Sequence, residues 1–529
     1  MIWGSKKYTP SVGISGLIFA RIALSWIRRF FLNQMICIFS FIVLIAQIIL
    51  YNQLRSDYIY TEYTHFIYIH HTGKIKFQWE DLNLNTKSKI IDYAGGKHMI
   101  NTLKSEWKTA EFFCEKTFFL WLKKFAEKHN IKKFVLVKPV ENYVYENFLK
   151  IQKKLKNIWV ELEILPDTQS FFLSHDDFKS QYKKPPIMEY FYRFMRKKED
   201  ILMDGKDPQG GQWNYDKENR KFDRKHEKSW SFELEKSEEL KEAEEYYNHE
   251  LNSFQPICRS EALELLEYFI SNHLDDFGRL EDAMYTDDNY VHHSLLSTAI
   301  NYGMLSPREV VEAVEKTDTA MNNKEWFIRQ VLGWREYMYH FFQFYKDDIY
   351  RENFLGHTRK LPDYFWSDAE ASDMKCLSST LRQVQSENFS HHIQRLMIIG
   401  NFSLLSWLNP HELNKWFFEY YTDAFEWVVT PNVLGMSQFA DGWNLATKPY
   451  VASANYINKM SDYCKWCKYN HKEKYTDDAC PFNYLYWNFV SKNKETFEKW
   501  RQQFVVNNLK KIDIEKIKEL KEKFLKKHS

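Results

Sequence analysis

The chain has 529 residues, which is too long for one hydrophobic core and indicates two domains. A formal net charge of +2 excludes a uniformly basic nucleic-acid binder, although a local basic groove is compatible with it. Aromatic residues make up 17% of the chain, and such side chains serve a packed core, base stacking or electron transfer.

The first 45 residues form an atypical apolar extension. Its stretch 35–50, MICIFSFIVLIAQIIL, follows two arginines and resembles a membrane anchor. It is shorter than the roughly 20 residues that usually span a bilayer. Its second half continues into residues 51–54 and is better explained as a buried first β-strand. We therefore expect a soluble, cytoplasmic protein and keep a membrane anchor as the alternative.

Residues 46–178 alternate between strand and helix patterns. Residues 65–69 and 134–137 are typical of strands, 118–128 is typical of a helix, and Val160, Leu162 and Ile164 alternate as a strand does. This spacing predicts an α/β domain with a parallel, doubly wound, Rossmann-like sheet.

Residues 179–258 read as a long connector that is rich in Pro, Gly and charge. Its basic residues Arg193, Arg196 and Lys197 lie beside the aromatic residues 190–192. This mixture suits a DNA phosphate backbone, and a solvated helix face explains it equally well. From residue 259 to 529 nearly every segment has a helical pattern, and the chain ends in a Lys/Glu-rich amphipathic helix carrying Leu509, Ile512, Ile517, Leu520 and Phe524.

Three of the seven cysteines crowd near the C-terminus, which indicates metal ligation in a reducing compartment. Cys464 and Cys467 form a C-x-x-C pair, and Cys480 precedes a proline. A fourth thiolate is needed, and Cys376 is the best candidate because it lies in the same helical region. The spacing alone leaves zinc and a [4Fe–4S] cluster open.

The helical region also carries ordered motifs. They comprise residues 188–192, 211–215, 277–284, 292–297, 327–337, 391–397, 423–427 and 431–442. In this order they closely resemble the iron–sulfur bacterial cryptochromes and photolyases, whose repair-active members are (6-4) photolyases. The likeness is strong from about residue 185 to 500 and weak before that.

The resemblance implies an N-terminal antenna domain followed by a helical FAD-binding domain. It also implies a [4Fe–4S] cluster held by Cys376, Cys464, Cys467 and Cys480. The expected flavin-site residues are Ser294, Leu295, Ser297, Gln330, Trp334, Arg395 and Asp423. Ser294 and Ser297 at a helix start suit a diphosphate, with helix capping as the alternative. Arg395 and Asp423 suit a buried pair near the flavin, although such pairs are often structural.

The resemblance assigns the catalytic role to His392, with His391 beside it. It implies repair of UV-damaged DNA, in which light-excited reduced FAD donates an electron and a histidine supplies a proton to the flipped-out lesion. Histidine suits proton donation because its pKa lies near neutrality. We expect a monomer without an obligate protein partner.

Some positions depart from the family. Trp366, Trp416 and Trp427 fit an electron relay, but Phe417 and Phe425 stand where we expect Tyr, and Val429 stands where we expect a carboxylate. The start of the chain lacks the family's Gly-Asp-Gln loop, so a ribityllumazine antenna is uncertain. A photoreceptor cryptochrome without repair activity is the alternative function, and a primase-like nucleic-acid-binding module is the third.

Overall fold

The computed structural model describes seven residues between Lys87 and His98 and then residues 118–528, apart from 227 and 500. The apolar extension 1–45 and the predicted strand 65–69 lie outside this part of the chain. The structure divides into two compact units. The first contains the described residues up to Phe172 together with Glu233–Glu264 and Leu296–Arg308. The second contains Leu173–Phe232, Leu265–Leu295 and the chain from Glu309 onward.

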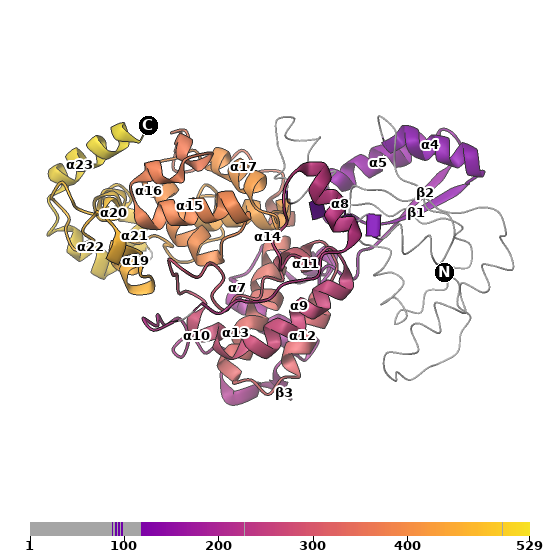
Figure 1. Cartoon of the computed structure of the whole chain (residues 1–529), viewed down its shortest axis with the longest axis horizontal. Helices are drawn as coiled ribbons and strands as arrows, with labels where there is room; N and C mark the ends of the chain where they lie inside the picture. Colours follow the sequence, from indigo (N-terminus) through magenta and orange to yellow (C-terminus); the bar gives the residue numbers. More distant parts are fainter. Residues whose placement is uncertain are drawn as a thin grey trace. The chain divides into compact units, whose positions relative to one another are not determined.

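The first unit contains a strand–helix–strand unit (Figure 1). Its elements are α4 (Phe118–His129), β1 (Lys133–Val137), α5 (Asn142–Lys156) and β2 (Glu161–Leu165). The strands are parallel, with register from Lys133 opposite Glu161 to Val137 opposite Leu165. Phe134, Leu136 and Leu162 pack in one buried core with the apolar sides of both helices. The predicted parallel pairing of these two segments is thus confirmed.

Two further helices in the described part of the first unit are short. They are α8 (Glu238–Tyr247) and α11 (Ser297–Asn301). The Ser237 side chain caps α8 by accepting a hydrogen bond from the backbone N–H of Leu240.

The second unit is helical apart from a two-residue hairpin, β3 (Met203–Asp204) with β4 (Asp207–Pro208), in the part that the structure describes. Its α-helices, including two that begin in the first unit, are α6 (His175–Gln181), α7 (Met188–Glu199), α9 (Arg259–Asn272), α10 (Leu274–Leu280), α12 (Pro307–Glu315), α13 (Met321–Ile328), α14 (Glu336–Tyr345), α15 (Lys375–Glu387), α16 (Asn401–Leu405), α17 (Pro410–Tyr420), α18 (Glu426–Thr430), α19 (Ala454–Met460), α20 (Pro481–Lys492), α21 (Lys494–Lys499), α22 (Gln503–Leu509) and α23 (Ile514–Lys527). Its short 3-10 turns are η3 (Gln209–Gly211), η5 (Asp363–Phe365), η6 (Ala369–Ser372) and η9 (Tyr463–Trp466).

Three π-helical turns interrupt the helices of the second unit: η4 (Arg329–Arg335), η7 (Gln394–Gly400) and η8 (Pro431–Ser437). The turns η4 and η8 lie within sequence motifs, and η7 begins in a third motif, 391–397. Turns of this kind are uncommon in proteins as a whole. Those that do occur often lie at functional sites, because they change the direction of the side chains around them. At Gly400 a Cβ atom would meet the Ser437 hydroxyl and would lie 3.0 Å from the Arg395 carbonyl oxygen. Glycine at this position therefore lets η7 and η8 approach closely.

The predicted connector has more structure than its sequence suggests. Its first half forms α6, α7 and the β3–β4 hairpin, and its last part forms α8. Pro185 and Pro186 lie between α6 and α7, Gly205 lies in the turn of the hairpin, and Gly210 and Gly211 lie in η3. The connector also contributes to both units. Its residues up to Phe232 belong to the second unit, and its residues from Glu233 onward belong to the first unit.

The C-terminal helix is shorter than predicted. Leu509 ends α22 and Ile512 lies in the turn that follows, because Asp513 caps α23 by accepting a hydrogen bond from the backbone N–H of Lys516. Ile517, Leu520 and Phe524 are buried as expected. In the described part of the chain, none of the helices has the length and apolar character needed to cross a membrane.

Candidate active site and metal site

Four cysteines from distant parts of the sequence line one cavity in the second unit. Cys376 lies in the first turn of α15, Cys464 lies in η9, Cys467 follows η9, and Cys480 precedes α20. Apolar and aromatic side chains complete the wall: Met374, Ile457, Tyr463, Tyr469 and Phe482. The described fifth cysteine, Cys258, belongs to the first unit. The predicted set of four thiols is therefore brought together.

The chemistry of this cavity suits a metal group. Burial, followed by the proximity of the other three thiols, raises the pKa of Cys376 well above its usual value. Burial likewise raises the pKa of Cys464 to about 12. Four thiolates in a closed apolar cavity are stable only beside positive charge, which a metal ion supplies. Both a zinc ion and a [4Fe–4S] cluster take such a set of ligands.

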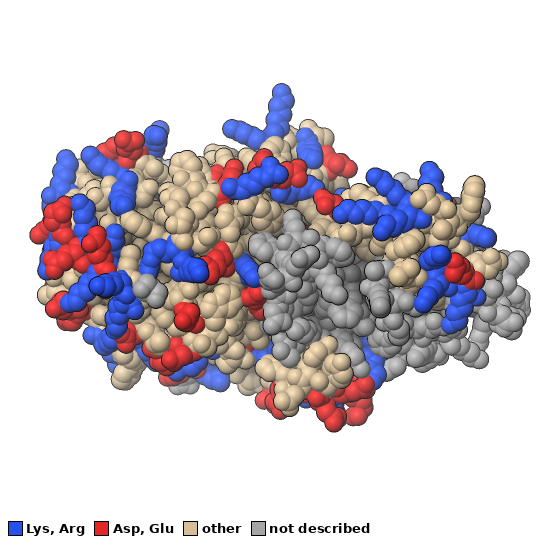
Figure 2. All heavy atoms as spheres, turned by 90° about the horizontal axis from the view of Figure 1, so that it is seen from above, with Lys and Arg blue, Asp and Glu red and all other residues tan. Residues whose placement is uncertain are grey.

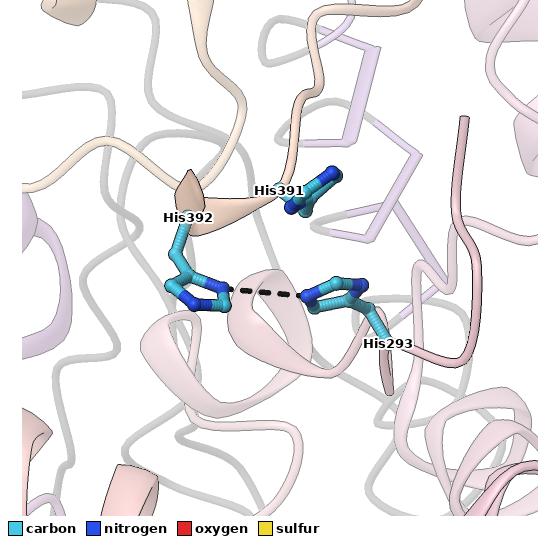
Figure 3. A group of neighbouring side chains, drawn as sticks. All are labelled: His293, His391 and His392. Atoms are coloured by element: carbon cyan, nitrogen blue, oxygen red, sulfur yellow. Dashed lines mark hydrogen bonds between the residues drawn. The ribbon is translucent and has the colours of Figure 1, made fainter. Parts of the chain in front are cut away.

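Three histidines from two motifs meet in the second unit (Figure 3). His293 precedes α11, and His391 and His392 lie just before η7. The Nε2 atom of His293 lies 3.3 Å from Nδ1 of His392, and its Nδ1 donates a hydrogen bond to the carbonyl oxygen of Tyr290 at 3.0 Å. The His391 ring stacks on that of His293 with centroids 4.5 Å apart.

The two neighbouring histidines have opposite environments. His391 is buried, and its two ring nitrogens have no hydrogen-bond partner among the described residues. Burial, followed by the two other histidines, lowers the pKa of His391 well below its usual value. The His392 side chain is 44% exposed, and its Nε2 lies 3.5 Å from both Glu281 and Asp282. Only His392 is therefore placed to give a proton to a molecule arriving from solvent.

Arg395 and Asp423 form the predicted pair. Arg395 Nη1 lies 3.0 Å from Asp423 Oδ1, and Nη2 lies 3.1 Å from Oδ2. Arg395 Nε donates to the Ser390 carbonyl oxygen at 2.7 Å, and its guanidinium lies over the Tyr421 ring. These contacts hold the guanidinium one helical turn beyond His391 and His392.

The remaining predicted flavin-site residues occupy helix starts and π-helical turns. Gln330 and Trp334 lie in η4 and are partly exposed, and the Gln330 amide donates to the Trp326 carbonyl oxygen. Leu295 has a positive φ of 55°, which is a strained backbone conformation for leucine. Ser297 begins α11, and Leu296 in the capping position makes no side-chain cap. The role of these residues in flavin binding stays a prediction.

The aromatic residues predicted as a relay fall into two groups. Trp416 is buried and stacks on Tyr420 at 5.1 Å, and Tyr420 contacts Trp366 at 6.0 Å. Trp366 is 36% exposed, so this group reaches the surface. Trp427 instead contacts Tyr339, Phe425 and Arg335. Tyr420 is not among the predicted relay residues, although its aromatic ring lies four residues after Trp416 on a predicted helix, which was a usable signal.

The basic residues of the connector surround one tryptophan. Arg193, Arg196 and Lys197 of α7 all lie 5.2–5.3 Å from the Trp213 ring centre. Arg196 is fully buried and donates to the carbonyl oxygens of Ile201, Leu202 and Trp213. The predicted contact with a DNA phosphate is therefore wrong for Arg196, because its N–H groups donate hydrogen bonds to buried backbone carbonyl oxygens. Arg193 is paired with Glu189 at 2.7 Å, and Lys197 is exposed.

Charge is mixed over the face of the molecule that Figure 2 draws, in the part that is described. Figure 2 shows Lys and Arg interspersed with Asp and Glu over the described part of the face drawn, in agreement with the net charge of +2. A nucleic-acid contact would therefore be local.

The sequence comparisons identify the family. A curated relative named "(6-4) photolyase", from Agrobacterium fabrum, is 41% identical over 352 residues, which cover 64% of this chain and 69% of the relative. This chain belongs to the photolyase and cryptochrome family. The family model for deoxyribodipyrimidine photo-lyase-related proteins also matches residues 104–252.

Solved structures give the same fold at low identity. A cryptochrome from Synechocystis is 13% identical with a TM-score of 0.51, covering 76% of this chain and 82% of its own. An archaeal photolyase from Sulfolobus tokodaii, solved with two FAD molecules, is 11% identical with a TM-score of 0.51, covering 80% of this chain and 87% of its own. The predicted fold, an α/β part followed by a helical photolyase part, is confirmed.

The structure also adds residues to the site that the sequence did not single out. His293, Glu281 and Asp282 converge on His392, and all three lie inside motifs that carried the family likeness. Their presence in those motifs was the only signal in the sequence, because the contacts join segments about 100 residues apart.

Proposed function

We propose that the chain is a (6-4) DNA photolyase, which uses blue light and reduced FAD to reverse (6-4) pyrimidine photoproducts. The observation that carries the proposal is the exposed His392, held by His293 on one side and by two carboxyl groups on the other. The 41% identity to a curated relative of that name supports the same reaction.

The bound FAD would supply an electron to the lesion on excitation by light. The residues proposed to hold FAD are the flavin-site residues that the family resemblance implies. Among them, the Arg395–Asp423 pair places a positive and a negative charge close to the histidines. The two unpartnered nitrogens of buried His391 fit a polar ligand, since buried polar atoms are rarely left unsatisfied. The chain's own part in the chemistry is to orient the flipped-out lesion and to provide a proton from His392.

The four thiols support a [4Fe–4S] cluster with a structural role. Three of them lie between residues 464 and 480, and Cys376 ties this segment to α15. A cluster here would cross-link two parts of the helical unit that lie far apart in the sequence. Cysteines that stay reduced fit the proposed cytoplasmic location. We also propose a ribityllumazine antenna and a monomeric state, and only the family resemblance supports these two.

The decisive test is repair of an oligonucleotide that contains one (6-4) photoproduct. The purified, flavin-loaded protein is incubated with it under blue light and in darkness, and intact thymines are measured by chromatography. We expect light-dependent repair, with a loss of about 100-fold or more in His392→Ala, which removes the proton donor.

His249→Ala serves as the matched control, because His249 is an exposed histidine of the first unit. It should repair at the wild-type rate. No repair by wild-type protein that visibly holds reduced flavin would contradict the photolyase assignment and favour a cryptochrome.

A further inference from the structure

The two neighbours of His392 have complementary roles that the proposed function does not assign. We propose that His392 and Glu281 share one proton at Nε2 of His392, while His293 fixes the other ring proton on Nδ1. Glu281 and His293 are thus positioning residues that keep a transferable proton at one nitrogen of His392. The inference rests on the proposed function, in which His392 gives up that proton.

The protonation of His293 follows from its contacts. A carbonyl oxygen only accepts hydrogen bonds, so the 3.0 Å contact with Tyr290 places a proton on Nδ1 of His293. Burial and the nearby His392 lower the pKa of His293 to about 3, so its ring is neutral at neutral pH. Its Nε2 atom therefore carries a lone pair that accepts a hydrogen bond.

This lone pair determines the state of His392. Its Nδ1 lies 3.3 Å from Nε2 of His293, and a hydrogen bond between them requires the proton to be on Nδ1 of His392. A second proton on the His392 ring then has one place only, which is Nε2. The proton that His392 loses and regains is consequently the one that faces Glu281 and Asp282.

The two carboxyl groups hold this second proton. Glu281 Oε1 and Asp282 Oδ1 each lie 3.5 Å from Nε2 of His392. Burial, followed by the charge of Asp282, raises the pKa of Glu281 well above its usual value, which favours the protonated form of this carboxyl. Its Oε2 atom has no hydrogen-bond partner among the described residues. The charged or titratable groups that surround the pair are His293, His391, Arg220, Arg329, Asp216 and Tyr456.

The proton count balances. When His392 gives its proton to the lesion, the Nε2–H bond breaks and an O–H or N–H bond forms on the departing group. Because the pair shares one proton, this Nε2–H bond is the one that forms as the Glu281 O–H bond breaks, so a carboxylate is left beside Arg220 and Arg329. Return of a proton from the repaired bases reverses both transfers.

The test measures the protonation of His392 directly, without light or DNA. Diethyl pyrocarbonate acylates neutral imidazole, and mass spectrometry of the peptide containing His392 gives its rate of modification in the full-length protein as a function of pH. At pH 7 we expect His392 in Glu281→Gln to react about three- to tenfold faster than in wild type, because the variant lacks the carboxyl proton that is shared with Nε2. Glu370→Gln, a change at an exposed carboxylate, should leave the rate unchanged. Equal rates in wild type and in a folded Glu281→Gln protein would overturn the proposal.

A second pair of variants tests His293 even if Glu281→Gln fails to fold. Glutamine at position 293 offers an oxygen that accepts from Nδ1 of His392, whereas phenylalanine offers none. We expect His293→Gln to keep the pH profile of repair and His293→Phe to shift its alkaline limit downward and lower the rate about tenfold. Identical profiles for the two variants would contradict the role of His293. If wild type repairs nothing and Glu281→Gln still reacts faster, the proton sharing stands and the photolyase assignment fails.

Discussion

Arg395 and Asp423 meet as a two-pronged pair, with both guanidinium Nη atoms within 3.1 Å of the two carboxylate oxygens. The pair joins the turn beside His391 to the segment before α18, across 28 residues of sequence. Such two-bond pairs fix orientation as well as distance. The Arg395–Asp423 pair therefore sets the position of η7 relative to α18.

Asp423→Asn should destabilise the protein by about 2 to 3 kcal/mol, because a partly buried guanidinium loses its charged partner. The measurement is the shift of the thermal unfolding midpoint. Glu370→Gln breaks an Arg–Glu pair of similar length, 2.7 Å, whose side chains are both more than half exposed. This control should cost less than about 1 kcal/mol. Equal shifts for the two variants would show that the Arg395–Asp423 pair is only a surface contact.

Cys480→Ser should remove most of the bound iron, because one of four thiolate ligands is lost from a closed cavity. Iron, sulfide and zinc are measured per protein chain in anaerobically purified samples. Cys258→Ser is the matched control: Cys258 is also buried, but its sulfur contacts Ser260 and not the other thiols. If the wild-type protein contains one zinc ion per chain and no sulfide, the site holds zinc and the assignment of a [4Fe–4S] cluster is wrong.

Stability should fall as the pH is lowered below about 6.5. Burial lowers the pKa of His273, His292 and His357 to about 4 in the folded protein. Between these values and the ordinary histidine pKa, the unfolded chain binds protons that the folded chain does not. The histidine contribution is thus fully present above pH 6.5 and is lost as the pH falls toward 4.

Each of these buried histidines lowers the free energy of unfolding by at most about 1.4 kcal/mol for each unit by which the pH falls. Thermal unfolding at pH 7, 6 and 5 measures the slope, with the absorbance of the metal group followed in parallel. His357→Phe removes one buried histidine outside the proposed active site and should give a shallower slope. A slope unchanged by this substitution would show that His357 is protonated in the folded protein.

Gly400→Ala should destabilise the protein by about 1 to 3 kcal/mol, because its Cβ would overlap the Ser437 side chain and approach the Arg395 carbonyl oxygen. Ser437→Ala removes the nearest atom, so the double variant should recover part of the loss. A double-mutant cycle of unfolding midpoints measures this coupling. Strict additivity of the two substitutions would show that η7 and η8 separate freely.

Much of the fold was predictable where one segment determines its own structure. The alternation of Val160, Leu162 and Ile164 predicted β2, and the C-x-x-C pair with Cys480 and Cys376 predicted the four thiols of the cavity. Local patterns failed where capping or burial decided the outcome. Asp513 divides the C-terminal helix, and Arg196 turns inward because three backbone carbonyl groups are available to it.

The histidine site was predictable only in part. The resemblance pointed to His392, but the sequence contains no local sign that His293 lies against it or that Glu281 lies on its other side. These contacts depend on how α10, the turn before α11 and η7 pack, which no periodicity in a single segment specifies. Tyr420 differs from these residues, because its place four residues after Trp416 was a local signal, and only its contact with Trp366 depends on distant packing.

The division into two units bears on how the protein is made. The chain passes from one unit to the other five times, after Phe172, Phe232, Glu264, Leu295 and Arg308. The first unit is therefore incomplete until Arg308 has left the ribosome, and by then parts of the second unit have already emerged. Domains usually fold one after another during synthesis, but here neither unit can be finished before the other has begun. No single cut in the gene separates the two units, because each product would still carry segments of both units or leave one unit incomplete, so expression trials are best made with the uncut chain.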